Sequence, residues 1–125
     1  MKILAIDYGT KNIGLAYYNK EVDVILPCGQ VNNMDEVVNF IKQWGVEQVI
    51  VGLPLGLDSK GNKNTKRIKN FVRELKNKTG LEIKLTDERF SSQQADRMGQ
   101  GVSRDEKSAM IIMQSYLNSI NPKII

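Results

Sequence analysis

The chain has 125 residues, a length typical of one domain, and its 41% hydrophobic and 26% charged residues are ordinary for a globular protein. It contains no histidine, which excludes histidine-assisted serine or cysteine catalysis and histidine-bound zinc, and its single cysteine, Cys28, excludes an internal disulfide or a cysteine-rich zinc site. Eighteen basic residues against fourteen acidic ones give a net charge of +4, and the apolar surroundings of Cys28 favour a core residue over a nucleophile.

The first third of the chain predicts three strands followed by a helix. Residues 2–7, 13–18 and 22–31 are β-prone and joined by short turns, with Pro27 interrupting the third stretch. Asn33 and Glu36 then form a capping pair, and the apolar residues up to Trp44 recur at helical intervals until Gly45 ends the helix.

The remainder alternates between strands and helices. Residues 49–51 predict a buried parallel strand, residues from about 64 to 79 a helix with a basic outer face, and residues 81–86 a further strand. Ser91 and Gln94 predict a short helix, and Ser103 and Glu106 a capping box for the last one. The apolar stripe of the last helix comprises Ala109, Met113, Tyr116, Leu117 and Ile120.

This order predicts an α/β fold over residues 1–125 as a single domain. A three-strand meander followed by β-α units gives a mixed five-stranded sheet with helices on both faces. Ligand sites in such sheets lie beyond the carboxyl ends of the parallel strands. We find no signal peptide and no apolar run near the roughly 18 residues that span a membrane, so a soluble cytoplasmic protein is expected.

Acidic residues stand at these strand ends. Asp7 ends the first strand before Gly9, and Asp87 and Glu88 end the last one, whereas Asp105 lies in the first turn of the last helix. Each has an ordinary use, in a turn or as a helix cap, and for each one alone that use is the commoner. Together, in a chain without histidine, they match the carboxylates that hold two hard cations such as Mg²⁺ in phosphoryl chemistry.

Basic residues cluster between positions 60 and 78, where eight of them accompany one acid, Glu74. Such a cluster suits a phosphate-binding face, although a solvated helix surface explains the charge equally well. Contacts to nucleic acid are expected from Lys11, Lys60, Lys63, Lys66, Arg67 and Arg89.

The sequence also resembles the YqgF/RuvX family of Holliday-junction resolvases and nucleases that mature 16S ribosomal RNA. The resemblance covers nearly the whole chain and rests on segments at residues 6–11, 13–14, 51–55 and 87–90 with Ala95, then Asp105, Ala109 and 114–117. It implies a ribonuclease-H-like fold, Mg²⁺ or Mn²⁺ as cofactor, and a catalytic, metal-holding triad of Asp7, Glu88 and Asp105. It also favours Glu88 over Asp87, which the residues alone leave open.

Three positions depart from the family pattern, and none of them removes a carboxylate. Asn12 replaces the usual arginine, which weakens the expected phosphate contact, Gly56 replaces a common asparagine, and Ser108 replaces the usual alanine.

Two other functions compete with a nuclease. The stretch from Asp7 to Thr10 with Gly14 looks like the first phosphate-binding turn of actin and sugar-kinase ATPases, which need two such domains where 125 residues supply one. A non-catalytic nucleic-acid or ribosome-binding module would use the basic helix but leaves the acids unexplained. The sequence leaves open whether the substrate is branched DNA or structured RNA in ribosomal precursor particles, and whether the protein is a monomer or a homodimer.

Overall fold

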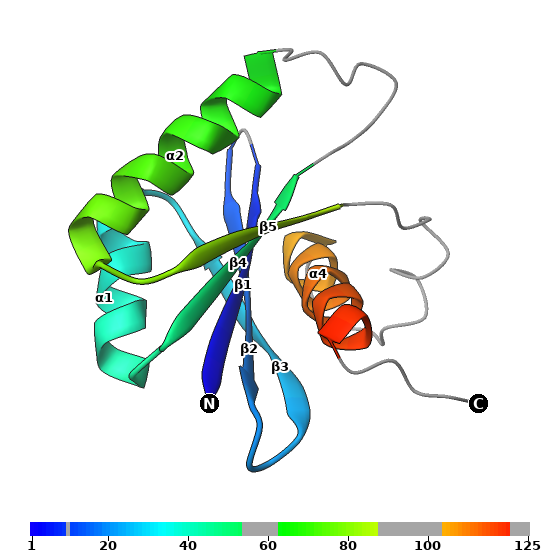
Figure 1. Ribbon diagram of the computed structural model, residues 1–125. Helices are drawn as coiled ribbons and strands as arrows, with labels where there is room; N and C mark the ends of the chain where they lie inside the picture. The colour runs from blue at the N-terminus through cyan, green and yellow to red at the C-terminus, as the bar shows by residue number, and fades with distance from the viewer. Residues whose placement is uncertain (10, 54–62, 88–103, 121–125) are drawn as a thin grey trace.

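The computed structural model describes residues 1–9, 11–53, 63–87 and 104–120 (Figure 1). Its strands are β1 (Lys2–Tyr8), β2 (Ile13–Asn19), β3 (Val24–Val31), β4 (Gln48–Leu53) and β5 (Ile83–Asp87). Its helices are α1 (Met34–Trp44), α2 (Lys63–Thr79) and α4 (Arg104–Ile120). Within these ranges, no helix combines the length and the apolar character that crossing a membrane requires.

The strands form one mixed sheet in the order β3-β2-β1-β4-β5. β2 runs antiparallel to both β1 and β3, whereas β4 runs parallel to β1, and β5 parallel to β4. Parallel neighbours cannot be joined by a tight turn, so a helix crosses over between β4 and β5. The predicted sheet, a meander extended by β-α units, is confirmed.

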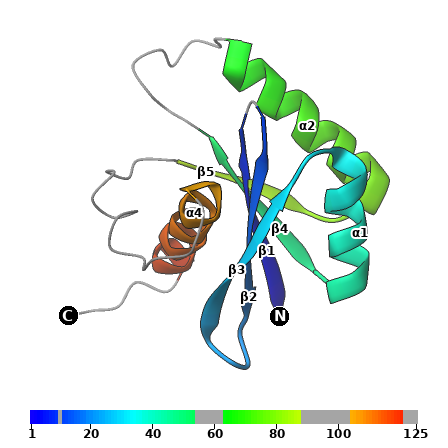
Figure 2. The ribbon, with the colours of Figure 1, turned by 180° about the vertical axis from the view of Figure 1, so that it is seen from behind.

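Helices cover both faces of this sheet, with α1 and α2 on one face and α4 on the other (Figures 1 and 2). Because side chains of a strand alternate between faces, β1 contributes to two separate cores. Leu4 and Ile6 pack with α1 and α2, and Ile3 and Ala5 pack with α4. The helix residues buried in these cores include Val37, Ile41, Ile68, Phe71 and Leu75 on the first face and Ala109, Ile112, Met113 and Tyr116 on the second.

Local signals define the ends of α1 as the sequence predicts. The Asn33 side chain accepts a hydrogen bond from the Glu36 N–H at 3.0 Å, and Gly45 ends the helix in the left-handed conformation with φ 64°. The Glu36 carboxylate accepts from the Asn32 N–H at 3.1 Å, one residue before the expected partner.

The edge position of β3 explains how this strand tolerates Pro27, because a proline there removes no central ladder bond. The β2–β3 register shifts between Gly14 and Ala16, where β3 carries Cys28 and Gly29 opposite Leu15. Such a bulge bends a strand and redirects its neighbours.

Two details of the sequence interpretation are wrong. β5 begins at Ile83 rather than at Leu81, because Gly80 takes a left-handed φ of 69° and the Leu81 N–H donates to the Thr79 hydroxyl at 3.3 Å. Ile120 does not belong to the buried stripe of α4: as the last residue of that helix it is 56% exposed, and Ile112 is buried instead. The predicted helix at Ser91 and the capping residue Ser103 lie outside the described residues.

Candidate functional site

Asp7 lies one residue before the carboxyl end of β1, and its position belongs to the face that α4 covers. It continues the series Ile3 and Ala5, both of which pack in the core beneath α4. Its side chain is half-buried, and its partner across the β1–β2 ladder is Gly14, which carries no side chain. Asp7 therefore holds a carboxylate near the carboxyl end of the central strand, on the face of the sheet that α4 covers.

The first turn of α4 reaches the same level of the sheet. The Glu106 carboxylate accepts a hydrogen bond from the Gly29 N–H at 2.7 Å, which joins the start of α4 to the bulge of β3. Gln30, the next residue, pairs with Gly14, and Gly14 pairs with Asp7. Asp105, directly before Glu106, thus has its backbone in the turn that docks beside this edge.

On the other side of β1, the carboxyl end of β5 lies at the same end of the sheet as Asp7. Lys84 lies on the α4 face, with its ammonium 5.6 Å from the centre of the Tyr116 ring. Asp87 is the last residue of β5 and pairs with Leu53 of β4. Glu88 and Arg89 lie outside the described residues, so the structure brings together the strand and helix that carry Asp7 and Asp105 without describing the third acid.

Within residues 1–9, 11–53, 63–87 and 104–120, no three Cys, Asp or Glu side chains gather into a group that could hold a metal ion. Glu88 falls outside these ranges, and for Asp105 only the backbone is described. The candidate ligands are carboxylate oxygens, and these are the donors that Mg²⁺ and Mn²⁺ prefer.

The basic residues of α2 form an exposed stripe on the outer side of that helix. Lys66, Lys69, Arg73 and Lys76 recur at helical spacing, and all four are exposed. For Lys63 the structure describes only the backbone, in the first turn of α2, and Lys60 lies outside the described residues. This basic stripe lies on the helix layer opposite the face of Asp7, so a polyanion would have to cross the sheet edge to contact both.

Arg67 differs from the rest of the basic cluster because it turns inward. Its guanidinium donates to the Gly9 carbonyl at 2.9 Å and lies 4.8 Å from the centre of the Tyr8 ring. It thereby fixes the turn that follows Asp7, a contact that charge patterning could not indicate. Lys11, on the far side of the same turn, is exposed.

Cys28 is half-buried on β3 beside the start of α4. Burial, together with the smaller effect of the negative charge of Glu106, raises the pKa of its thiol to about 11. A thiol with this pKa is protonated at neutral pH, which agrees with the expectation that Cys28 is not a nucleophile.

This architecture is the ribonuclease-H-like fold. RuvC of Thermus thermophilus, solved in complex with a Holliday junction substrate, superimposes with a TM-score of 0.65 at 10% identity, covering 97% of each chain. A second structure of the same protein gives a TM-score of 0.65 at 11% identity.

Sequence comparison narrows this class to a family. The sequence model described as "RuvX: Holliday junction resolvase" matches residues 1–119. A protein of Dictyoglomus turgidum is 33% identical, covering 97% of this chain and 96% of its own, and one of Bacteroides fragilis is 35% identical, covering 94% and 96%. Both are named "Putative pre-16S rRNA nuclease". The chain belongs to the RuvX family.

Proposed function

We propose that this protein is a metal-dependent nuclease that hydrolyses phosphodiester bonds, with Asp7, Glu88 and Asp105 as the metal-holding acids. One observation carries the proposal: Asp7 belongs to the face of the sheet that α4 covers, and the first turn of α4 is bonded to the bulge of β3, two strands away at the same level of the sheet. The family name and the names of its relatives support nuclease chemistry.

The alternation of β5 supports Glu88 over Asp87 as the third acid. Val49 and Val51 of β4 belong to the core under α1 and α2, and their partners on β5 are Ile83 and Leu85. Even positions of β5 therefore belong to the other face, as the contact of Lys84 with Tyr116 shows. Asp87, at an odd position of β5, does not have the parity of the face to which Asp7 belongs, and this leaves Glu88 as the proposed third acid.

The residues of the chain have separate tasks in this proposal. Asp7, Glu88 and Asp105 would hold Mg²⁺ or Mn²⁺, which when bound supplies the positive charge that stabilises attacking and leaving oxygens. Arg67 keeps the turn after Asp7 in place through the Gly9 carbonyl. The basic stripe of α2, together with Lys11, neutralises phosphates of the bound strand.

For the substrate we propose the 5′ region of precursor 16S ribosomal RNA, a branched DNA junction, or both. The relatives at 33% and 35% identity carry the name of the first activity, and the family model carries the name of the second. Precursor ribosomal particles would then be partners of the protein.

A non-catalytic nucleic-acid-binding module is the second candidate, and the basic stripe of α2 favours it, because four exposed cations bind phosphate without any chemistry. The two candidates differ at the acids. A binding module gains nothing from carboxylates at the sheet edge, since they repel phosphate unless a cation intervenes.

The first prediction tests the acids directly. The purified protein should cleave a precursor rRNA 5′ segment or a synthetic four-way junction with Mg²⁺ or Mn²⁺, and cleavage should stop in EDTA. Asp7→Asn should abolish cleavage while retaining the circular dichroism spectrum of the folded chain. Mg²⁺ at about 100 times its Kd should stabilise the folded protein by about 2.7 kcal/mol, because it binds only the assembled site.

Asp35→Asn is the matched control, because Asp35 is an exposed acid on α1, over the opposite face of the sheet. This variant should cleave as the wild type does. Cleavage that survives chelation, or full activity of Asp7→Asn, would exclude the mechanism, and metal-independent binding without cleavage of either substrate would establish the binding module.

A further inference from the structure

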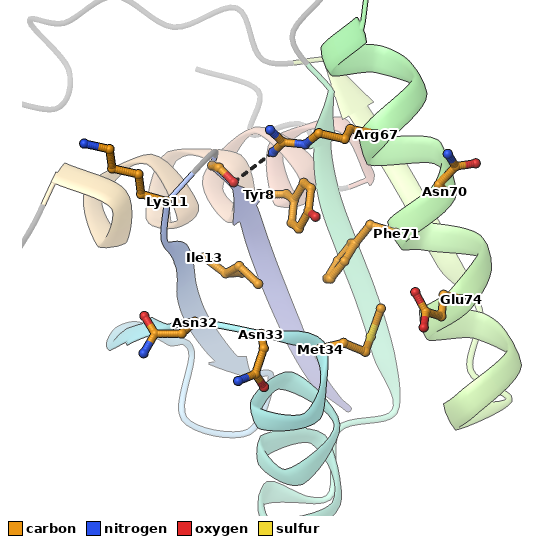
Figure 3. A pocket seen from close by; sticks show the side chains of 11 residues that line it. Tyr8, Lys11, Ile13, Asn32, Asn33, Met34, Arg67, Asn70, Phe71 and Glu74 are labelled. Atoms are coloured by element: carbon orange, nitrogen blue, oxygen red, sulfur yellow. Dashed lines mark hydrogen bonds between the residues drawn. The ribbon is translucent and has the colours of Figure 1, made fainter.

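A cavity of about 260 Å³ lies on the face of the sheet opposite to Asp7 (Figure 3). It is bounded by the end of β1 and the turn after it, by the start of α1, and by one side of α2. On α2 the lining residues Arg67, Asn70 and Glu74 follow one another at helical spacing, beside the basic stripe but distinct from it. The proposed nuclease mechanism uses two of the lining residues, Lys11 and Arg67, but gives no task to the cavity between them and Glu74.

The middle of the cavity is apolar. Figure 3 shows the side chains of Tyr8, Ile13, Met34 and Phe71 together in its centre, with polar side chains around them. The Tyr8 and Phe71 rings stack with their centroids 4.3 Å apart. Ile13 and Phe71 are almost fully buried, so the half-buried side chains of Tyr8 and Met34 supply the apolar surface that a ligand can contact.

One end of the cavity is positively charged. Arg67 is half-buried there, and its position is fixed by the 2.9 Å bond to the Gly9 carbonyl and by the Tyr8 ring. Lys11, at the same turn, adds a second and exposed cation. A guanidinium that is already held in place loses little freedom when it binds an anion, so this end suits a phosphate group.

The other walls carry hydrogen-bonding groups of both kinds. Asn32, Asn33 and Asn70 present amides, which donate and accept, and Glu74 presents a carboxylate, which only accepts. The Oδ1 atom of Asn33 is occupied by the Glu36 N–H, which leaves its amide nitrogen as a donor toward the cavity region. The carboxylate of Glu74 repels a phosphate and accepts a hydrogen bond from an amino group. A ligand that has both groups should therefore bind with its phosphate away from Glu74 and its amino group toward it.

We propose that this cavity binds a single nucleotide, with its phosphate at Lys11 and Arg67, its base against Tyr8 and Met34, and the amino edge of that base toward Glu74. The volume lies just below the range of about 300–1,000 Å³ typical of sites for drug-sized ligands, which suits one nucleotide and no longer segment. The nucleotide is either an unpaired residue of a nucleic-acid strand or a free mononucleotide. The first source extends the proposed nuclease function, and the second is independent of it.

The test measures binding by calorimetry in EDTA, where the proposed metal site is not assembled. The full chain is titrated with GMP and UMP, with a short RNA duplex carrying one unpaired guanosine, and with the same duplex fully paired. Lys11→Glu and Asn70→Glu place negative charge in the cavity, and each should weaken nucleotide binding about tenfold or more. Lys20→Glu and Asn77→Glu are matched exposed controls outside the lining, and they should bind as the wild type does.

Each outcome decides a separate point. Saturable binding of GMP that exceeds UMP, with the preference lost in Glu74→Gln, supports a free nucleotide as ligand. Binding confined to the duplex with the unpaired guanosine, and sensitive to Asn70→Glu, supports a residue of the substrate strand. Absence of both, or binding that ignores Lys11→Glu and Asn70→Glu, overturns the proposal, whereas the cleavage assay with Asp7→Asn judges the nuclease function independently.

Discussion

At the scale of single residues, Arg67 has a different environment from the basic residues beside it on α2. Its neighbours Lys66 and Lys69 are exposed, whereas Arg67 is half-buried and donates to the Gly9 carbonyl. Its Nε atom is buried and has no hydrogen-bond partner among the residues that the structure describes. One position along a helix turns a side chain by about 100°, which is enough to separate the exposed Lys66 from the half-buried Arg67.

Cys28 gives a prediction about chemical reactivity. Burial, reinforced by Glu106, raises the pKa of the thiol from an ordinary value of 9.0 to about 11, so the native protein holds about a hundredfold less thiolate at pH 8 than the unfolded chain. Iodoacetamide should therefore alkylate native Cys28 much more slowly than Cys28 in urea. The native rate should rise with pH until about pH 11.

The same shift makes stability depend on pH. A raised pKa in the folded state stabilises the protein below pH 9, and this contribution is lost as the pH rises through about 11. The difference in unfolding free energy between the wild type and Cys28→Ser should shrink over that interval. A native alkylation rate equal to the unfolded rate at pH 8 would contradict the assigned environment.

At the scale of elements, a hydrogen bond from β3 to Glu106 ties down the first turn of α4. Glu106 accepts from the Gly29 N–H at 2.7 Å, and this partner lies 77 positions earlier in the chain. Glu106→Ala should lower the free energy of unfolding by about 1–3 kcal/mol, since it leaves a half-buried N–H without its charged acceptor. The rate of cleavage at saturating substrate should fall by more than the loss of folded protein explains, because a displaced first turn also displaces Asp105.

Glu47→Ala is the matched control, because the Glu47 carboxylate also accepts a backbone N–H, that of Lys2, at 3.2 Å and at the opposite end of β1. Glu47→Ala should lower the free energy of unfolding without changing the turnover rate of the protein that remains folded. Glu106→Gln keeps an acceptor and should restore most of the activity. Equal turnover in Glu106→Ala and Glu47→Ala would show that Glu106 has no positioning role.

The elements also show what the sequence can predict. The ends of α1 were predictable because their causes are local: the Asn33 cap and the left-handed Gly45 involve residues within a few positions of each other. Ile120 was assigned wrongly because helical spacing does not reveal where the sheet beneath α4 ends. The bond from Glu106 to Gly29 had no sequence signal, since Glu106 looked like an ordinary capping residue.

At the scale of the whole molecule, Asp7 and the basic stripe of α2 belong to different layers. Asp7 lies on the α4 face, and the basic stripe of α2 lies over the other face. Reversing Lys66 and Lys69 to Glu should weaken the binding of every nucleic acid alike, because phosphate contacts carry no sequence information. The slope of log K against log salt should fall by about 0.9 for each duplex phosphate contact that is lost.

Lys20 and Lys42 form the matched pair for that experiment, since both are exposed and lie outside α2. Reversing them changes the net charge by the same amount, so an effect of charge alone would appear in both double variants. An unchanged salt slope in the α2 double variant would show that the stripe makes no phosphate contacts and is an ordinary solvated helix surface.

The arrangement of the candidate site was predictable only in part. The place of Asp7 near the carboxyl end of the first strand was predictable, and this agrees with the range of β1 and its place in the sheet. The approach of α4 to that edge depends on the bulge of β3 and on packing beneath Ala109 and Met113, which involve residues far apart in the chain. The cavity on the other face was missed because its polar residues come from three separate segments.

The bond between Glu106 and Gly29 has a consequence for the order of events during synthesis. β1, β2, β3 and β4 can pair as soon as they emerge, but the turn that carries Asp105 docks only after α4 has followed, 77 positions beyond its partner. Under the proposed function, a nascent chain that already exposes the basic helix can attract nucleic acid before the acids that we propose as metal ligands are assembled. Cutting activity would begin only once α4 has closed onto the sheet, which spares any strand captured during translation.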